Sequence, residues 1–177
     1  MRTICLCLLL LTLSGVLSAQ KDDANPKKLE LELSVSESIN TSLNFKFGRS
    51  RIYGIVSGGI VRFDNLRNSA IGLGLGTQQS RGKGWTNEIE LLAYTMNRDG
   101  DFSGDLSMLT QLRLTAGKQL TSRFKLYCGP VLNMSFLKNK DVDGRFSNDI
   151  APYSIWSNEK DNFKMNGWIG IAGGIRF

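Results

Sequence analysis

Hydrophobic and polar residues alternate along most of the chain after residue 28, and the alternation is most regular in residues 163–177. Side chains of a β-strand point alternately to opposite faces, so each alternating segment predicts a strand with one apolar face. In 163–177 the apolar face carries Phe163, Met165, Gly167, Ile169, Ile171, Gly173, Ile175 and Phe177, and the other face carries Lys164, Asn166, Trp168, Gly170, Ala172, Gly174 and Arg176. An aromatic residue at the end of such a strand, as at Phe177, is typical of a closing strand that ends at a membrane interface.

Six other regions repeat this alternation. Residues 29–47 keep one phase throughout, so they form either one very long strand or two strands that meet near Glu37 and Ser38. Counted as two, they bring the total to eight, and the remaining strands are expected at 51–63, 71–76, 88–93, 106–118, 124–136 and 163–177. An even number of strands is typical of single-chain bacterial barrels, in which each crossing takes about 9–11 residues. We therefore predict an antiparallel up-and-down transmembrane β-barrel of about eight strands.

Three details of the strands follow from their pattern. In 51–63 the alternation places Tyr53 and Ile55 on the apolar, outward face. Pro130 removes a hydrogen-bond donor from its strand and predicts a bulge there. Cys128 belongs to the outward set of the same strand, where a thiol in apolar surroundings is inert.

The face opposite the apolar one carries charged residues, and these are Glu30, Glu32, Lys46, Arg62, Glu88, Glu90, Arg113, Lys125, Lys164 and Arg176. A soluble β-sandwich would present such a face to water, whereas a lipid-embedded barrel turns it inward. In a barrel of about eight strands side chains fill the interior, so these charges must pair or be hydrated. For Glu88 and Glu90 we expect pairing with Arg62 or Arg113. Alternation alone fits both folds, but the even strand count and the inward glycines of 71–76 favour the barrel.

The N-terminal residues have the pattern of an export signal. Arg2 precedes an apolar stretch at 4–16, and Leu17-Ser18-Ala19 offers a small-residue cleavage site. The stretch is too short to span a bilayer core of ~30 Å, which needs roughly 20 residues; the alternative is an uncleaved N-terminal anchor helix. We expect a signal peptide at 1–19, a polar lead at 20–28 and an outer-membrane barrel at 29–177.

Composition removes several classes of function. The chain has no histidine, which excludes Ser-His-Asp and Cys-His catalysis and His-ligated metals, so we expect no enzyme activity and no cofactor or metal. Without Cys5 and Cys7 of the signal peptide, Cys128 alone remains and no intrachain disulfide is expected. The formal net charge is +6, but the bases are scattered and form no long run, so nucleic acid is not an expected partner.

Two polar segments are candidate sites. Residues 99–105 match the opening spacing of a calcium loop, but Thr110 stands where the bidentate Glu belongs, so a solvated hairpin loop is expected instead. Residues 138–162 form the longest predicted surface loop, in which Phe146, Tyr153 and Trp156 either contact a surface glycan or protein or fold back on the barrel rim. We expect them at the rim.

Three short stretches carry a family resemblance: Ser18-Ala19-Gln20, the segment 125–130 that ends in Gly129-Pro130, and the last residues 174–177. The chain resembles the small outer-membrane β-barrel families common in Bacteroidota, those with an outer membrane protein beta-barrel domain. The resemblance implies an outer-membrane location, contact with outer-membrane lipid, and recognition by the barrel assembly machinery through the C-terminal strand. Ile175 and Phe177 fit the assembly signal of such families, whereas Gly170 and Ala172 stand where a polar residue and a glycine are usual.

The pattern and the resemblance together indicate a location more than an activity. We expect an outer-membrane barrel with a plugged lumen and a structural or surface-interaction role through its extracellular loops. The alternatives are a soluble exported β protein that binds a small hydrophobic ligand, and a small pore. A lipid-modifying barrel enzyme is disfavoured because the chain has no histidine.

Overall fold

The computed structural model describes residues 27–49, 51–61, 69–97, 107–138 and 150–177. These residues form antiparallel strands, namely β1 (Lys27–Ser36), β2 (Thr41–Arg49), β3 (Ile52–Ile60), β4 (Ser69–Gly82), β5 (Trp85–Asn97), β6 (Ser107–Gln119), β7 (Lys125–Lys138), β8 (Trp156–Lys160) and β9 (Phe163–Arg176). Within the described ranges, no helix is long and apolar enough to cross a membrane.

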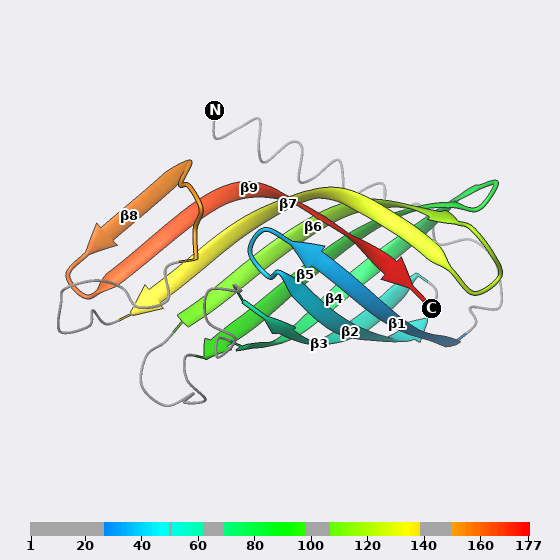
Figure 1. The fold of residues 1–177 in the computed structure, drawn as a ribbon, viewed down its shortest axis with the longest axis horizontal. Helices are drawn as coiled ribbons and strands as arrows, with labels where there is room; N and C mark the ends of the chain where they lie inside the picture. Colours follow the sequence, from blue (N-terminus) through cyan, green and yellow to red (C-terminus); the bar gives the residue numbers. More distant parts are fainter. Residues whose placement is uncertain (1–26, 50, 62–68, 98–106, 139–149) are drawn as a thin grey trace.

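The sheet closes on itself. Each strand from β1 to β6 pairs with the next, β7 pairs with β9, and β9 pairs back to β1. Hydrogen bonds therefore run around a ring of eight strands, which we call the barrel (Figure 1). This confirms the predicted antiparallel up-and-down architecture, and of the two possibilities left open for residues 29–47 the structure shows two strands, β1 and β2.

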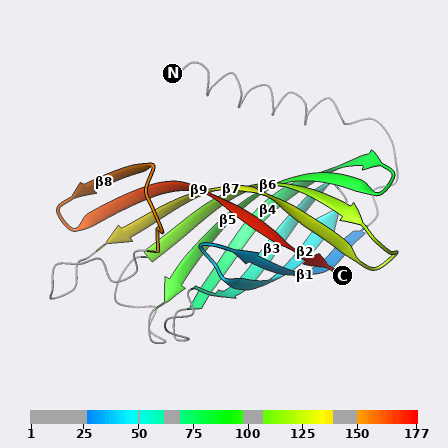
Figure 2. The ribbon, with the colours of Figure 1, turned by 45° about the horizontal axis from the view of Figure 1, so that its top comes forward.

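The two ends of the barrel differ in their connections. At one end the β2–β3, β4–β5 and β6–β7 connections are short, and β1 begins and β9 finishes there (right in Figures 1 and 2). We call it the short-turn end. The tightest turn joins β4 to β5 through Lys83 and Gly84, whose φ angles of 50° and 75° suit the hairpin turns that match strand twist. The opposite end, with the longer β3–β4, β5–β6 and β7–β8 connections, is the loop end.

A ninth strand lies outside the barrel. Residues 138–162 were expected as a loop, but β8 forms a hairpin with β9 in which Trp156 is opposite Gly167 and Lys160 is opposite Phe163. The turn between them uses Asp161 with a positive φ of 52°. The prediction was wrong here because β8 has five exposed residues and no apolar alternation, so its strand state depends on its pairing with the long strand β9.

The two faces of the barrel wall have opposite character. The outward face is apolar and includes Leu31, Leu33, Val35, Leu43, Phe45, Phe47, Val56, Leu73, Leu75, Leu91, Leu126, Leu132, Ile169 and Ile171. The inward face carries its fully buried charged side chains in the half that adjoins the short-turn end, and mainly buried apolar and uncharged polar side chains toward the loop end. The predicted phases of all strands except β3 are confirmed.

In β3 the predicted phase was wrong. Tyr53 and Ile55 point inward and are 1% exposed, whereas Ile52 and Val56 face outward. β3 has apolar residues on both faces, so its own pattern does not define a polar side. The register with β4 determines which face of β3 points inward. Tyr53 pairs with Gly76, and its ring lies over this glycine, where a Cβ would be 2.5 Å from the ring.

The bulge predicted at Pro130 is also absent. Arg113 pairs with Val131 and Ala116 pairs with Cys128, which is the same register on both sides of the proline. The missing donor therefore interrupts the β6–β7 ladder without shifting it, while β7 pairs continuously with β9.

Candidate functional site in the barrel interior

The half of the lumen nearer the short-turn end contains a buried group of ionised side chains. We call it the charge cluster, and it consists of Glu32, Lys46, Glu88, Glu90, Arg113, Lys125 and Arg176. All seven were predicted inward from the alternation, and each is at most 5% exposed. Of the other predicted inward charges, Glu30 and Lys164 are half-buried, and Arg62 lies outside the described residues.

Lys46 lies at the centre of the charge cluster. Its Nζ is 2.5 Å from a carboxylate oxygen of Glu32, forms a second ion pair with Glu90, and lies 3.8 Å from Glu88. Glu32 is on the neighbouring strand β1, whereas Glu88 and Glu90 come from β5. Lys46 therefore connects separate parts of the barrel wall through the lumen.

Arg176 makes a second set of contacts at the end of β9. Its guanidinium pairs with Glu32 and Glu88 and lies 3.5 Å from Glu90. The guanidinium also lies over the ring of Tyr127, 4.3 Å from the ring centroid. Lys125 is directly opposite Arg176 in the β7–β9 register and reaches Glu88 at 3.4 Å, so two cations converge on this carboxylate.

The expected pairing of Glu88 and Glu90 with Arg113 was wrong. Arg113 is directly opposite Glu90 in the β5–β6 register, yet its ion pair is with Glu32, at 3.7 Å. Its guanidinium donates to the Tyr94 hydroxyl at 3.0 Å and to Gln111 at 2.9 Å. In so narrow a barrel the far wall is within reach, and the glutamates bond to Lys46 and Arg176 across the lumen.

Uncharged polar side chains lie next to the charge cluster, on the side toward the loop end. The Asn44 amide donates to Glu32 at 2.6 Å and to the Ser34 hydroxyl at 2.9 Å. On the opposite side of the barrel, Gln111 donates to Asn133 at 2.8 Å. These bonds link the charge cluster to the neighbouring polar side chains. They also provide hydrogen-bond partners for polar groups that are buried away from water.

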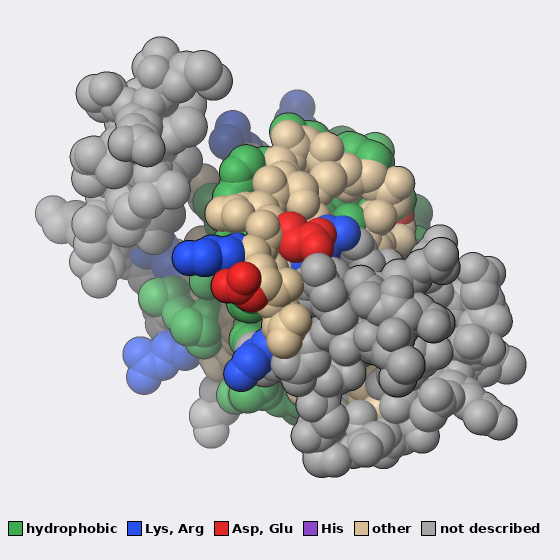
Figure 3. Space-filling view, turned by 90° about the vertical axis from the view of Figure 1, so that its left-hand side faces the viewer, with side chains coloured by type: hydrophobic (Ala, Val, Ile, Leu, Met, Phe, Trp, Pro, Cys, Tyr) green, Lys and Arg blue, Asp and Glu red, His purple; other side chains and the backbone are tan. Residues whose placement is uncertain are grey.

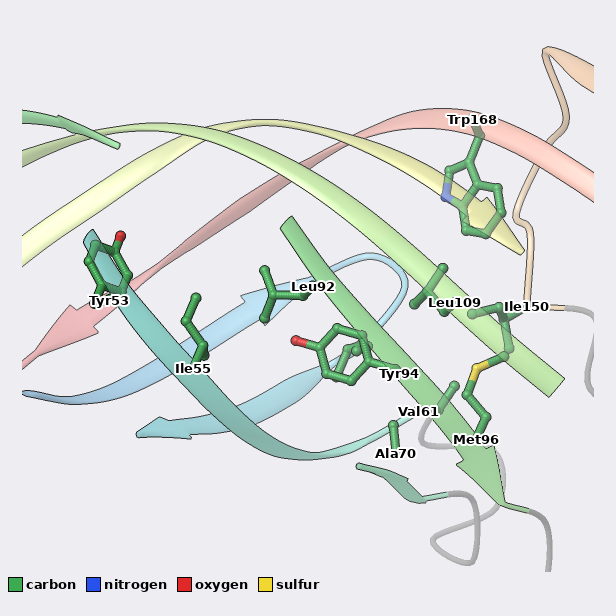
Figure 4. Close-up of a cluster of buried hydrophobic side chains, with 11 residues drawn as sticks. Tyr53, Ile55, Val61, Ala70, Leu92, Tyr94, Met96, Leu109, Ile150 and Trp168 are labelled. Carbon is green, nitrogen blue, oxygen red and sulfur yellow. The ribbon is translucent and has the colours of Figure 1, made fainter. Parts of the chain in front are cut away.

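A group of buried apolar side chains runs along the lumen, from Tyr53 near the short-turn end to Trp168 and Ile150 toward the loop end (Figure 4). We call this the apolar cluster, and its members are Ile39, Tyr53, Ile55, Val61, Ala70, Leu92, Tyr94, Met96, Leu109, Ile150 and Trp168. Ile150 comes from the β7–β8 connection, so part of the predicted loop 138–162 packs inside the barrel mouth. Sequence reasoning overlooked Leu92 and Tyr94, although they share the phase of Glu88 and Glu90.

One edge of β9, opposite the edge that pairs with β7, is covered by side chains over residues 168–171 instead of by a second strand. β1 pairs with β9 only from Ala172 to Arg176, and β8 pairs with it only from Phe163 to Gly167. Between them the Ile171 N–H donates to the Glu37 carboxylate at 2.8 Å, and the Tyr153 hydroxyl donates to the Ile169 carbonyl. The Glu37 carboxylate also accepts from Asn133 at 3.3 Å and occupies the space where a side chain on Gly170 would lie. Glu37 thus ties the β1–β2 turn to β7 and β9.

The remaining candidates divide between the described and undescribed parts of the chain. Cys128 is exposed on the outward face, as predicted. Tyr153 folds back on β9 through its hydroxyl, as expected for a rim residue, and Trp156 is exposed on β8. The calcium-like segment 99–105 and Phe146 lie outside the described residues. Within the described ranges, no group of three or more acidic, Cys or His residues is arranged to hold a metal ion.

No protein-family model, curated protein or solved structure matches this chain. The barrel has a wall with an apolar outer face around a lumen that holds the charge cluster and the apolar cluster.

Proposed function

We propose that this protein is an outer-membrane barrel with a sealed lumen that anchors a surface-exposed hairpin. The observation that carries the proposal is the inverted polarity of the wall. Charged residues such as Lys46 and Arg176 are at most 2% exposed, whereas Leu73, Leu75 and Ile171 are more than 60% exposed. Such a wall is suited to a lipid bilayer, because the acyl chains cover its apolar outward face. The closed ring also pairs most backbone N–H and C=O groups, which have no water to bond to inside a bilayer.

Hydrophobic energetics favour the membrane over water. Removing one large apolar side chain from water contributes about 1.5–3 kcal/mol, and apolar side chains cover the outward face of every barrel strand. A soluble carrier of a hydrophobic ligand needs the reverse arrangement, with an apolar lumen and a polar outer face. Here the half of the lumen that adjoins the short-turn end is charged, which disfavours that alternative.

The connections suggest an orientation. Barrels of this class have short turns on the periplasmic side and longer loops outside the cell. The loop end would then be extracellular, together with the β8–β9 hairpin that extends beyond the barrel (Figure 1). Viewed from the loop end, basic and acidic side chains lie beside one another on the described surface (Figure 3). With Tyr153, Ile155 and Trp156 exposed, the hairpin is the candidate contact for a surface glycan or protein.

Cys128 provides a direct test of membrane insertion. Its neighbours on the outward face of β7 are Leu126 and Pro130, so bilayer lipid would cover the thiol. In protein lacking residues 1–19 and folded into vesicles, we expect Cys128 to resist a charged, water-soluble maleimide and to react with a lipid-soluble one. Thiol labelling with mass detection measures this, and boiling the sample in detergent should shift its gel mobility. Rapid labelling by the charged reagent, with no mobility shift on boiling, would contradict the membrane proposal.

The sealed lumen predicts an electrically silent protein. The lumen holds the buried side chains of the charge cluster and the apolar cluster, so we expect no continuous path for ions. In planar bilayers we expect no steady conductance steps from samples whose gel mobility confirms folding. Stable, reproducible steps from the same samples would favour the small-pore alternative.

A further inference from the structure

The short-turn end carries a ring of positive charge that the sealed barrel does not require. Each of its three turns, together with the last residues of the strand before it, contributes two basic residues, and we call the set the basic rim: Arg49, Arg51, Arg81, Lys83, Lys118 and Arg123. No acidic residue occurs in 47–53, 79–87 or 117–125. Within the described ranges, no ion pair is formed by Arg49, Arg81, Lys83, Lys118 or Arg123.

Contacts between the turns make the basic rim continuous. The Gln78 N–H at the end of β4 donates to the Arg51 carbonyl at 3.0 Å, which ties the β2–β3 turn to β4. The Lys118 ammonium donates to the Lys83 carbonyl at 2.7 Å, which ties the β4–β5 turn to β6. The segments that carry these bases are therefore tied to one another at one end of the barrel, where like charges repel unless an external anion compensates them.

Apolar and aromatic side chains lie directly beside the basic rim. Trp85 and Lys118 are paired on the outward face, with the ammonium 5.1 Å from the ring centroid. Phe124 packs edge-on against Phe177 at a centroid distance of 5.2 Å, and Leu120 is exposed in the same turn. The bases thus begin where the apolar wall finishes, at the depth of lipid headgroups in an embedded barrel.

Among the described residues, the loop end does not share this uniform charge. Its described charged residues include bases and acids, namely Lys138, Glu159, Lys160, Asp161 and Lys164. The asymmetry between the ends therefore calls for an anionic partner at the short-turn end alone.

We propose that the basic rim binds the phosphate headgroups of anionic phospholipids in the membrane leaflet at the short-turn end. The inference rests on the proposed function, because the headgroups meet the basic rim only if the barrel is embedded. A lipid fits better than a soluble anion because one molecule satisfies both neighbouring surfaces: its phosphate faces the bases and its acyl chains cover the apolar wall. Each base near such a surface contributes about a fivefold gain in association.

Trp85 reports on the lipid at the basic rim. In the Trp156→Phe variant only Trp85 and the buried Trp168 remain, so bromine on lipid chains quenches chiefly Trp85. The protein is folded into phosphatidylcholine vesicles that contain brominated phosphatidylglycerol or, at the same mole fraction, brominated phosphatidylcholine. We expect an association about fivefold or more tighter for the anionic lipid, and a loss of this preference at high salt, which screens exposed charges.

Matched variants identify the basic residues that bind the anionic lipid. Arg81→Gln with Lys83→Gln should remove most of the preference for the anionic lipid, and Lys138→Gln with Lys160→Gln at the loop end should leave it unchanged. Equal quenching by both lipids, in protein whose gel mobility shifts on boiling, would overturn the inference and leave the membrane proposal intact. Equal quenching together with co-sedimentation on peptidoglycan would overturn it in favour of a cell-wall polymer. Failure to insert into either vesicle would refute the proposed function itself.

Discussion

Replacing Lys46 with Met is expected to lower the free energy of unfolding by about 3–5 kcal/mol, the range for removal of one partner from a buried ion pair. Lys46 is fully buried and makes ion pairs with Glu32, Glu88 and Glu90. Met has a similar length but no charge, so the substitution removes the cation and keeps most of the volume. Carboxylates would then remain in the lumen with one fewer counter-charge, and Arg176 would be the main cation left beside Glu32 and Glu90.

Urea unfolding of the vesicle-inserted protein measures this effect, with the heat-shifted gel band reporting the folded fraction. Lys160→Met on the exposed strand β8 is the matched control, and we expect it to change the unfolding free energy by less than about 0.5 kcal/mol. Adding Glu90→Gln to Lys46→Met should restore part of the lost unfolding free energy, because it removes one of the carboxylates left without a counter-charge. A Lys46→Met protein as stable as its control would mean that the charge cluster does not hold the barrel together.

Gly129→Ala is expected to destabilise the barrel by about 3 kcal/mol, near the upper range for inserting a methyl group into a packed site. A Cβ at this position would overlap the Leu114 carbonyl oxygen and lie 2.8 Å from the Cα of Thr115. These are backbone atoms of the adjacent strand β6 and cannot turn away as a side chain would. The overlap could be removed only if β6 and β7 moved apart beside Pro130, where the hydrogen-bond ladder between them is already interrupted.

Gly58→Ala provides the control for Gly129→Ala. Nothing lies within 4 Å of a Cβ added at Gly58, which is an exposed residue of β3. Ala is favoured over Gly in strand interiors by roughly 0.5–1 kcal/mol, so this variant should be as stable as the original protein or slightly more stable. The same urea series compares the two. Equal destabilisation by both variants would show that strand glycines act through chain entropy and not through the approach of β7 to β6.

Most of the wall could be predicted from the sequence because strand side chains alternate with a period of two, and this rule needs no tertiary information. It placed all seven members of the charge cluster inward and Cys128 outward. It failed in β3, because Ile52 and Val56 lie on one face and Tyr53 and Ile55 on the other. Both faces are apolar, so the pattern does not show which one is outward. It also missed β8, because a short polar strand that pairs with one neighbour leaves no periodic signal.

The sequence by itself determined the fold class, a ring of about eight strands and the inward direction of the seven residues of the charge cluster. Only the tertiary structure decided which charges meet. Glu90 and Arg113 are neighbours in the β5–β6 register, yet Glu90 bonds to Lys46 and Arg176, and Arg113 turns toward Tyr94. The tertiary structure likewise placed Ile150 in the barrel mouth and Glu37 beside β9. Alternation specifies the face on which a side chain lies, whereas contacts across a lumen depend on ring closure and register, which no local pattern encodes.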